Sequence, residues 1–180
     1  MKKATLTLGA GLILLTGWLL VPGIASAQAL KTPIEGRLTN CSNLGEPERE
    51  WVDEDGIRHV RGWRYFCRHS GHFGDVQGQE EGVFGFDVDP VAGTLFQRGK
   101  NSFFGRILGG DAPATGHWTA ECTRSEPGPF TCTEDHVWHL EDGRLLKFTT
   151  TYLTGLFPIP YTGFLLDPPG LRLGVRQLRR

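Results

Sequence analysis

Glu134 and His136 are the side chains of this sequence whose types and spacing best fit acid–base chemistry. They stand two positions apart in residues 130–140, where apolar and polar side chains alternate. Alternate residues of a strand point to the same face, so the pair would share a face with Phe130 and Trp138. If that face lines an apolar interior, burial shifts both pKa values and creates a candidate acid–base pair. If it points outward, or inward without a substrate, the two are polar neighbours only, and we favour this second interpretation.

A second group of residues has the types that bind metal ions, because histidine and carboxylate side chains are common metal ligands. These residues are His69, His72, Asp75, Glu80 and Glu81. Positions i and i+3 of a strand point to opposite faces, so the two histidines could bind one ion only from a loop. We interpret the group as solvated loop residues, and we expect no metal ion and no cofactor.

Aromatic side chains make up 11% of the chain and could line a site for an apolar ligand. Core packing is the simplest explanation for such a set, since a domain of this size needs large apolar side chains in its interior. A ligand cavity is the sharper hypothesis. The residues expected to contact such a ligand are Trp63, Tyr65, Phe86, Phe104, Trp118 and Trp138, with Phe84 in the same aromatic set.

The elements that would position these side chains are short runs of alternating apolar and polar residues. They are residues 34–38, 57–68, 75–89, 94–108, 116–124, 130–140, 145–154 and 171–175. Short runs of this kind, separated by Gly, Pro and Asp turns, predict an all-β fold. Glycines within the runs, such as Gly62 and Gly85, suit the bulges that curl a sheet. We therefore predict a closed antiparallel barrel of about eight strands, with a β-sandwich as the alternative.

Two segments carry more specific expectations. In residues 57–68, strict alternation places His59, Arg61 and Trp63 on one face. Residues 155–166 are apolar and uncharged, and their prolines exclude a regular central strand. Because an apolar segment must be covered, we expect it to plug the barrel, to form a lid over a cavity or to contact another subunit. The lid or interface residues would be Leu156, Phe157, Ile159, Tyr161 and Phe164.

Length and composition indicate one globular domain with a short appendage. The chain has 180 residues, 39% of them hydrophobic and 22% charged, and its formal net charge is -1 at pH 7. A nucleic-acid partner is not expected, because phosphate contacts need a clustered excess of basic residues. The sequence contains no Gly-x-Ser-x-Gly motif, phosphate loop or dinucleotide fingerprint, so nucleotide-dependent enzymes are not favoured.

Residues 1–27 have the features of an export signal. Lys2 and Lys3 precede an uncharged, Leu-rich stretch over residues 6–20, and Ala25-Ser26-Ala27 fits a cleavage site. The alternative is an uncleaved membrane anchor, but glycines and a proline interrupt the apolar stretch. We therefore predict a cleaved signal peptide, a single domain over residues 28–180, a secreted or periplasmic location and no stable membrane span after cleavage.

Four cysteines follow the predicted signal peptide, and an even number in an exported protein indicates two disulfides. Cys122 and Cys132 flank a turn-rich stretch between two predicted strands. The simplest of the three possible pairings therefore joins Cys122 to Cys132 and Cys41 to Cys67. A zinc site is the less favoured alternative, because no Cys-x-x-Cys spacing occurs.

Residues 74–118 carry a pattern of glycines and aromatic residues that resembles a known family. The pattern comprises Gly74-Asp75-Val76-Gln77-Gly78, Gly93-Thr94, Gly99-Lys100-Asn101-Ser102-Phe103-Phe104-Gly105, Gly109-Gly110 and Thr115-Gly116-His117-Trp118. It resembles the allene oxide cyclase-like barrels, which include small exported bacterial proteins and share their general architecture with plant dirigent proteins. The resemblance implies an eight-stranded antiparallel barrel, often a homo-oligomer, whose cavity can hold an apolar ligand. Some members are cyclases, but no catalytic position carries over to this chain.

These observations predict an exported, disulfide-stabilised barrel that acts as a non-enzymatic binding or structural module for an apolar small molecule or a partner. A cyclase or isomerase that uses Glu134 and His136 is the first alternative. An oligomeric interaction protein that uses residues 156–166 is the second. A cavity well under ~300 Å³ would be too small for a drug-sized ligand, so cavity volume separates the first two hypotheses from the third.

Overall fold

The computed structural model describes residues 29–71, 75–124 and 127–168, and these residues form ten β-strands and no helix. The strands are β1 (Leu30–Leu44), β2 (Arg49–Val52), β3 (Arg58–Gly71), β4 (Val76–Asp89), β5 (Thr94–Ile107), β6 (Gly110–Asp111), β7 (Ala114–Thr123), β8 (Thr131–Leu140), β9 (Leu145–Leu153) and β10 (Ile159–Asp167). The predicted signal peptide and the predicted strand at residues 171–175 lie outside the described residues. The described part of the chain also holds no helix of the length and apolarity that crossing a membrane requires.

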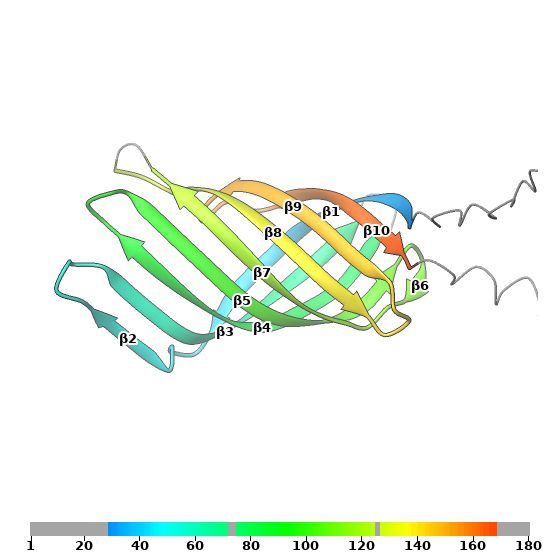
Figure 1. Ribbon diagram of the computed structural model, residues 1–180, viewed down its shortest axis with the longest axis horizontal. Coiled ribbons are helices and arrows are strands. Elements are labelled where there is room, and N and C mark those ends of the chain that lie inside the picture. The colour runs from blue at the N-terminus through cyan, green and yellow to red at the C-terminus, as the bar shows by residue number, and fades with distance from the viewer. Residues whose placement is uncertain (1–28, 72–74, 125–126, 169–180) are drawn as a thin grey trace, which may run out of the picture.

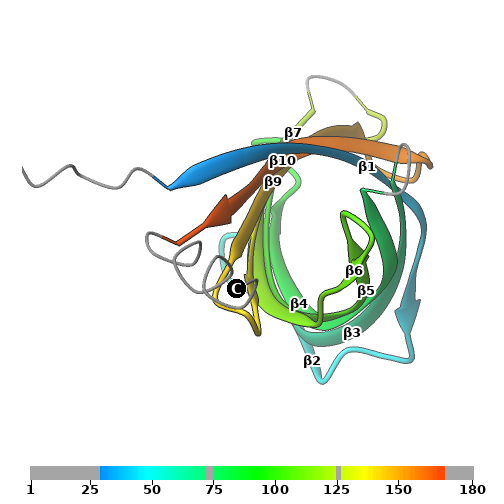
Figure 2. The same cartoon turned by 90° about the vertical axis from the view of Figure 1, so that its right-hand side faces the viewer.

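Eight of the strands form a closed antiparallel barrel. Their order around the ring is β1-β10-β9-β8-β7-β5-β4-β3, and pairing of β3 with β1 completes the circle (Figures 1 and 2). The two remaining strands lie outside the ring, where β2 pairs with β3 and β6 pairs with β5. The predicted closed barrel is confirmed, and the sandwich alternative is wrong.

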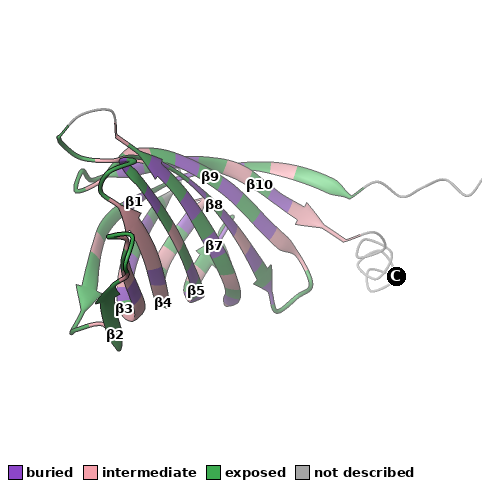
Figure 3. Ribbon diagram, turned by 60° about the vertical axis from the view of Figure 1, so that its left-hand side comes forward, coloured by how far each residue is buried: buried purple, intermediate pink, exposed green. Residues whose placement is uncertain are grey.

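Alternation within each strand decides which side chains enter the barrel, as the banding of buried and exposed residues in Figure 3 shows. In β8, Glu134, His136 and Trp138 are buried, whereas the residues between them are exposed or half-buried. Alternation therefore predicts the inward face of β8 correctly. The outward orientation that we considered for Glu134 and His136 is wrong, because both side chains point into the interior.

A β-bulge in β3 breaks the alternation that the sequence predicts. The pairing of β3 with β4 shifts register between Val60 and Trp63, and Gly62 has a φ of 70°, which residues with a side chain rarely adopt. The extra residue lets Val60 and Tyr65 both point inward, although they are five positions apart. Arg61 instead donates a hydrogen bond to Asp87 at 2.6 Å. The predicted shared face of His59, Arg61 and Trp63 is therefore wrong.

The apolar segment over residues 155–166 also differs from its prediction. β10 is a regular ring strand between β1 and β9, although Pro160 is its second residue. β10 pairs with β9 only from Tyr161 onward, so the missing N–H of Pro160 leaves no gap in that ladder. Ile159, Tyr161 and Leu165 are buried in the barrel. This part of the segment is barrel wall and not a plug.

The barrel interior has a packed half and an open half. The packed half lies at the end that carries β6, and the connection that contains β6 runs across this end in Figures 1 and 2. Phe103 and Trp138 stack there with ring centroids 4.6 Å apart. The fully buried side chains of the packed half are Ile34, Val76, Phe103, Ile107, Trp138, Leu146 and Leu165. At the other end, beyond which β2 extends, the interior is hollow.

Both disulfides of the predicted pairing are present. Cys41–Cys67 joins β1 to β3 where the ring closes, and Cys122–Cys132 joins β7 to β8. The two cysteines of each pair stand directly opposite one another in their ladder. Each bridge is expected to stabilise the fold by roughly 2–4 kcal/mol. Two disulfides are typical of proteins in oxidising compartments, such as the periplasm or the cell exterior.

Candidate functional site

The open half of the barrel contains a cavity of about 490 Å³. Its mouth lies where β3 begins and β4 ends, because both Arg58 and Val88 line it. Drug-sized ligands occupy pockets of about 300–1,000 Å³. The cavity is therefore large enough for a ligand or substrate, as a binding or catalytic barrel requires, and the barrel is not filled by its own side chains.

One side of the cavity is an aromatic wall, which consists of Trp63, Tyr65, Phe84, Phe86 and Trp118. Trp63 and Phe84 stack with ring centroids 5.8 Å apart and an interplanar angle of 6°. Phe84 also meets Trp118 at 5.9 Å. A Cβ at Gly99 would lie 2.6 Å from the Trp118 indole, so glycine at this position leaves the space that the indole fills.

The rest of the cavity wall combines apolar side chains with a disulfide. Its residues are Leu38, Cys41, Cys67, Tyr152, Phe157 and Ile159. Phe157 lies in the connection between β9 and β10 and is 43% exposed, so it stands at the mouth of the cavity. Leu156 and Phe164, which we grouped with it as lid or interface residues, are exposed and do not line the cavity.

The structure brings together four of the six aromatic residues that were expected to contact a ligand. Trp63, Tyr65, Phe86 and Trp118 line the cavity, whereas Trp138 is enclosed in the packed half. Phe104 is 60% exposed on the outer surface, because its neighbour Phe103 takes the inward position. The expectation that Phe104 lies in an aromatic interior is therefore wrong.

Glu134 and His136 lie together at the inner end of the cavity. Glu134 accepts a hydrogen bond from the Tyr152 hydroxyl at 2.8 Å, and its other oxygen lies 2.7 Å from Nε2 of His136. That second contact is not aligned as a hydrogen bond, and neither ring nitrogen of His136 has an aligned partner among the described residues. The imidazole stacks on Phe148 with ring centroids 4.2 Å apart, which fixes its plane.

Electrostatics favour a charged imidazole at this position. Burial by itself disfavours the charged form, but the negative charge of Glu134 outweighs it, so the pKa of His136 is raised. Burial and the same carboxylate raise the pKa of Tyr152, which therefore stays a hydrogen-bond donor. The group can hold a ligand through hydrogen bonds or charge, and it can also exchange a proton with one.

A second carboxylate, Glu80, lies fully buried near the middle of the barrel. It accepts hydrogen bonds from the hydroxyl of Tyr65, from Nδ2 of Asn101 at 2.6 Å and from Nε2 of His69 at 2.8 Å. Burial disfavours its charge, but the bond to His69 and the nearby charge of His136 outweigh burial and lower the pKa of Glu80 to about 2. Glu80 is therefore an ionised carboxylate inside the barrel.

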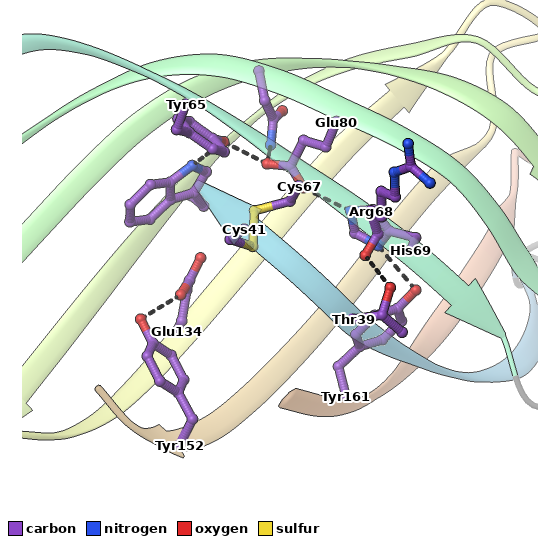
Figure 4. Close-up of a disulfide and its surroundings, with 12 residues drawn as sticks. Thr39, Cys41, Tyr65, Cys67, Arg68, His69, Glu80, Glu134, Tyr152 and Tyr161 are labelled. Carbon is purple, nitrogen blue, oxygen red and sulfur yellow. Dashed lines mark hydrogen bonds and ion pairs between the residues drawn. A yellow bond between two sulfur atoms is a disulfide. The ribbon is translucent and has the colours of Figure 1, made fainter. Parts of the chain in front are cut away.

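The bonds around Glu80 continue into a longer network that crosses the barrel. Trp118 donates through Nε1 to the Tyr65 hydroxyl at 2.6 Å, and Nδ1 of His69 lies 3.1 Å from the hydroxyl of Tyr161. Figure 4 shows Tyr65, Glu80, His69 and Tyr161 of this network around the Cys41–Cys67 disulfide, with Glu134 and Tyr152 as a separate pair. The network links five strands of the ring, β3, β4, β5, β7 and β10.

The sequence interpretation of His69 and Glu80 as solvated loop residues is wrong. Both are buried in strands, and His69 uses both ring nitrogens within the protein. His72 lies outside the described residues. Within the described ranges, no three His, Cys, Asp or Glu side chains gather as a metal site would require. Alternation along the strands could have identified the pair. Glu80 lies an even number of positions from Phe84, and His69 lies an even number of positions from Tyr65, so each would share a face with an aromatic residue.

Comparison of the chain with protein-family models, with curated proteins and with solved structures finds no match.

Proposed function

We propose that this chain is an exported, non-enzymatic β-barrel that binds an apolar small molecule in its open half. The observation that carries the proposal is the cavity of about 490 Å³ between an aromatic wall and a disulfide-bearing wall. Ligand sites are typically concave and mostly apolar, with a few polar groups that fix orientation. Glu134, His136 and Tyr152 would supply those polar groups. The predicted export signal and the two disulfides support a secreted or periplasmic location.

Titration with Nile red, an uncharged apolar dye, tests the proposal. We expect saturable binding of one dye per chain, and we expect Trp63→Ala to weaken the affinity roughly tenfold or more, because a buried aromatic contact contributes about 1.5–3 kcal/mol. Phe104→Ala is the matched control, since Phe104 is a large aromatic residue on the outer surface. Binding that is absent, or equally weakened by both variants, would overturn the proposal.

A cyclase or isomerase acting on an apolar substrate is the second candidate, because a buried imidazole lies 2.7 Å from a carboxylate inside the cavity. The resemblance to allene oxide cyclase-like barrels supports the same candidate. An isomerisation leaves the ligand mass unchanged, so chromatography and mass spectrometry of co-purifying compounds separate the two candidates. Binding predicts the same compound in wild-type and Glu134→Gln protein from one host. Catalysis predicts two isomers of identical mass.

A further inference from the structure

The charged groups that face the cavity bear on the chemical class of the ligand. Two carboxylates, Glu80 and Glu134, line the cavity together with two basic residues, Arg58 and His136. Glu80 accepts three hydrogen bonds, which stabilise its ionised form. The question is therefore how much positive charge the two basic residues bring to the interior.

Arg58 brings little charge to the interior. Its Nε lies 2.8 Å from the carboxylate of Glu50, and 46% of its side chain is exposed. The guanidinium lies 5.6 Å from the ring centroid of Phe86, at the mouth of the cavity. Arg58 is therefore a rim residue whose charge is matched by a neighbour and screened by water.

His69 contacts Glu80 through Nε2 at 2.8 Å but does not line the cavity. His136 remains as the interior cation, and it lies against Glu134. Two carboxylates and one imidazole therefore line the interior part of the cavity.

The aromatic wall adds a second, independent preference for positive charge. The faces of aromatic rings attract cations, most strongly for tryptophan. Trp63, Phe84 and Trp118 line the cavity as a run of contacting rings, with centroid separations of 5.8 and 5.9 Å. Such a wall accommodates an ammonium group that carries apolar substituents, because the rings also bury those substituents.

Building on the proposed binding function, we propose that the ligand is a lipophilic organic cation, whose ammonium group lies between the aromatic wall and Glu134. A ligand carboxylate would meet two buried carboxylates at the same place. A neutral apolar molecule would fill the volume but offer neither a charge nor a donor to Glu134, which accepts one aligned hydrogen bond within the protein. The preference for a cation is therefore the specific feature of this site.

Three probes of similar shape test the inference by displacement of Nile red at pH 7. They are benzyltrimethylammonium, its uncharged isostere neopentylbenzene and the anion phenylacetate. We expect the cation to bind roughly tenfold more tightly than the neutral isostere, and the anion to bind most weakly. Neutral binding equal to or tighter than cation binding would overturn the cation inference and leave the proposed function standing. Failure of Nile red itself to bind would overturn the proposed function.

Variants assign the preference to the proposed group. Glu134→Gln is expected to weaken the cation roughly tenfold and to leave the neutral probe unchanged. Asp135→Asn is the matched control, because it removes one negative charge from the exposed face of the same strand. His136→Gln removes the interior cation and is expected to tighten cation binding, so the inference stays testable if Glu134→Gln does not fold. Equal effects of Glu134→Gln and Asp135→Asn, or weaker cation binding in His136→Gln, would contradict it.

Discussion

Glu80 and Glu134 are two carboxylates inside the same barrel, and their surroundings differ. Glu80 accepts three hydrogen bonds from Tyr65, His69 and Asn101. Glu134 accepts one aligned hydrogen bond, from Tyr152, and has one unaligned contact with His136. A buried charge is costly unless hydrogen bonds or counter-charges satisfy it. Glu80 is therefore satisfied by the fold, whereas Glu134 retains capacity for a ligand.

Burial alone does not mark a functional carboxylate in this barrel. Glu80 is the more deeply buried of the two, and its pKa is lowered to about 2, yet its donors come from the protein itself. These donors lie on β3 and β5, the two neighbours of β4, so the network ties adjacent strands together. We interpret Glu80 as a residue that stabilises the barrel and Glu134 as a residue that serves its cavity.

The largest effect expected from this comparison is a loss of stability in Glu80→Gln. The change is expected to lower the free energy of unfolding by about 3–5 kcal/mol, because the amide loses the buried charge and keeps only one acceptor oxygen for three donors. Chemical denaturation monitored by tryptophan fluorescence measures the change. Glu81→Gln on the exposed face of β4 is the control and should change stability by less than about 0.5 kcal/mol.

Glu80 also makes the free energy of unfolding depend on pH in the acidic range. The folded pKa of Glu80 is lowered from 4.5 to about 2, so its contribution is complete above pH 4.5 and is lost as the pH falls toward 2. We expect wild-type protein to lose about 3 kcal/mol from this group across that window. Glu80→Gln should remove this part of the pH dependence. An unchanged acid profile in the variant would show that Glu80 is not the satisfied carboxylate of the pair.

The two disulfides extend the comparison to the barrel wall and carry the next largest effect. Replacing either cysteine pair by serine is expected to cost roughly 2–4 kcal/mol of unfolding free energy. The sequence separation is 26 residues for Cys41–Cys67 and 10 for Cys122–Cys132. Closing the longer loop removes more chain entropy, so its loss should cost about 1 kcal/mol more.

Ligand affinity should separate the same two variants. Cys41 and Cys67 line the cavity, whereas Cys122 and Cys132 do not. Nile red titrations in denaturant-free buffer at pH 7 should therefore show weaker binding only in the variant that carries both Cys41→Ser and Cys67→Ser. Equal affinities of the two double variants for Nile red would mean that the disulfide between β1 and β3 does not shape the site.

Much of the fold could be predicted from the sequence, because alternation and cysteine spacing are local signals. Alternation in residues 130–140 predicted that Glu134, His136 and Trp138 share a face, and the structure adds that this face is the interior. Alternation failed in β3, where the bulge at Gly62 inserts one residue. The effect of Pro160 depends on where β9 begins to pair with β10, which the proline itself does not reveal.

The Glu80 network could not be assembled from sequence in the same way. Its members are spread over residues 65–161, and curling of the sheet into a ring brings Trp118 to Tyr65 and Tyr161 to His69. Alternation would have grouped Glu80 with Phe84 and His69 with Tyr65, but their polar character led us to predict solvated loop residues. The cavity has the same origin, since its volume depends on which interior positions large side chains leave unfilled.

Side-chain indole signals of the tryptophans give the most direct test of the central claim, that the open half of the barrel binds a ligand. The measurement is a ¹⁵N–¹H correlation spectrum recorded during titration with benzyltrimethylammonium. Trp63 and Trp118 line the cavity, whereas Trp138 lies in the packed half and Trp51 stacks on His59 outside the ring. Binding in the open half predicts saturable shifts of the Trp63 and Trp118 indole signals, with the signals of Trp138 and Trp51 unchanged. Shifts confined to Trp51, or no saturable shift at any of the four, would contradict it.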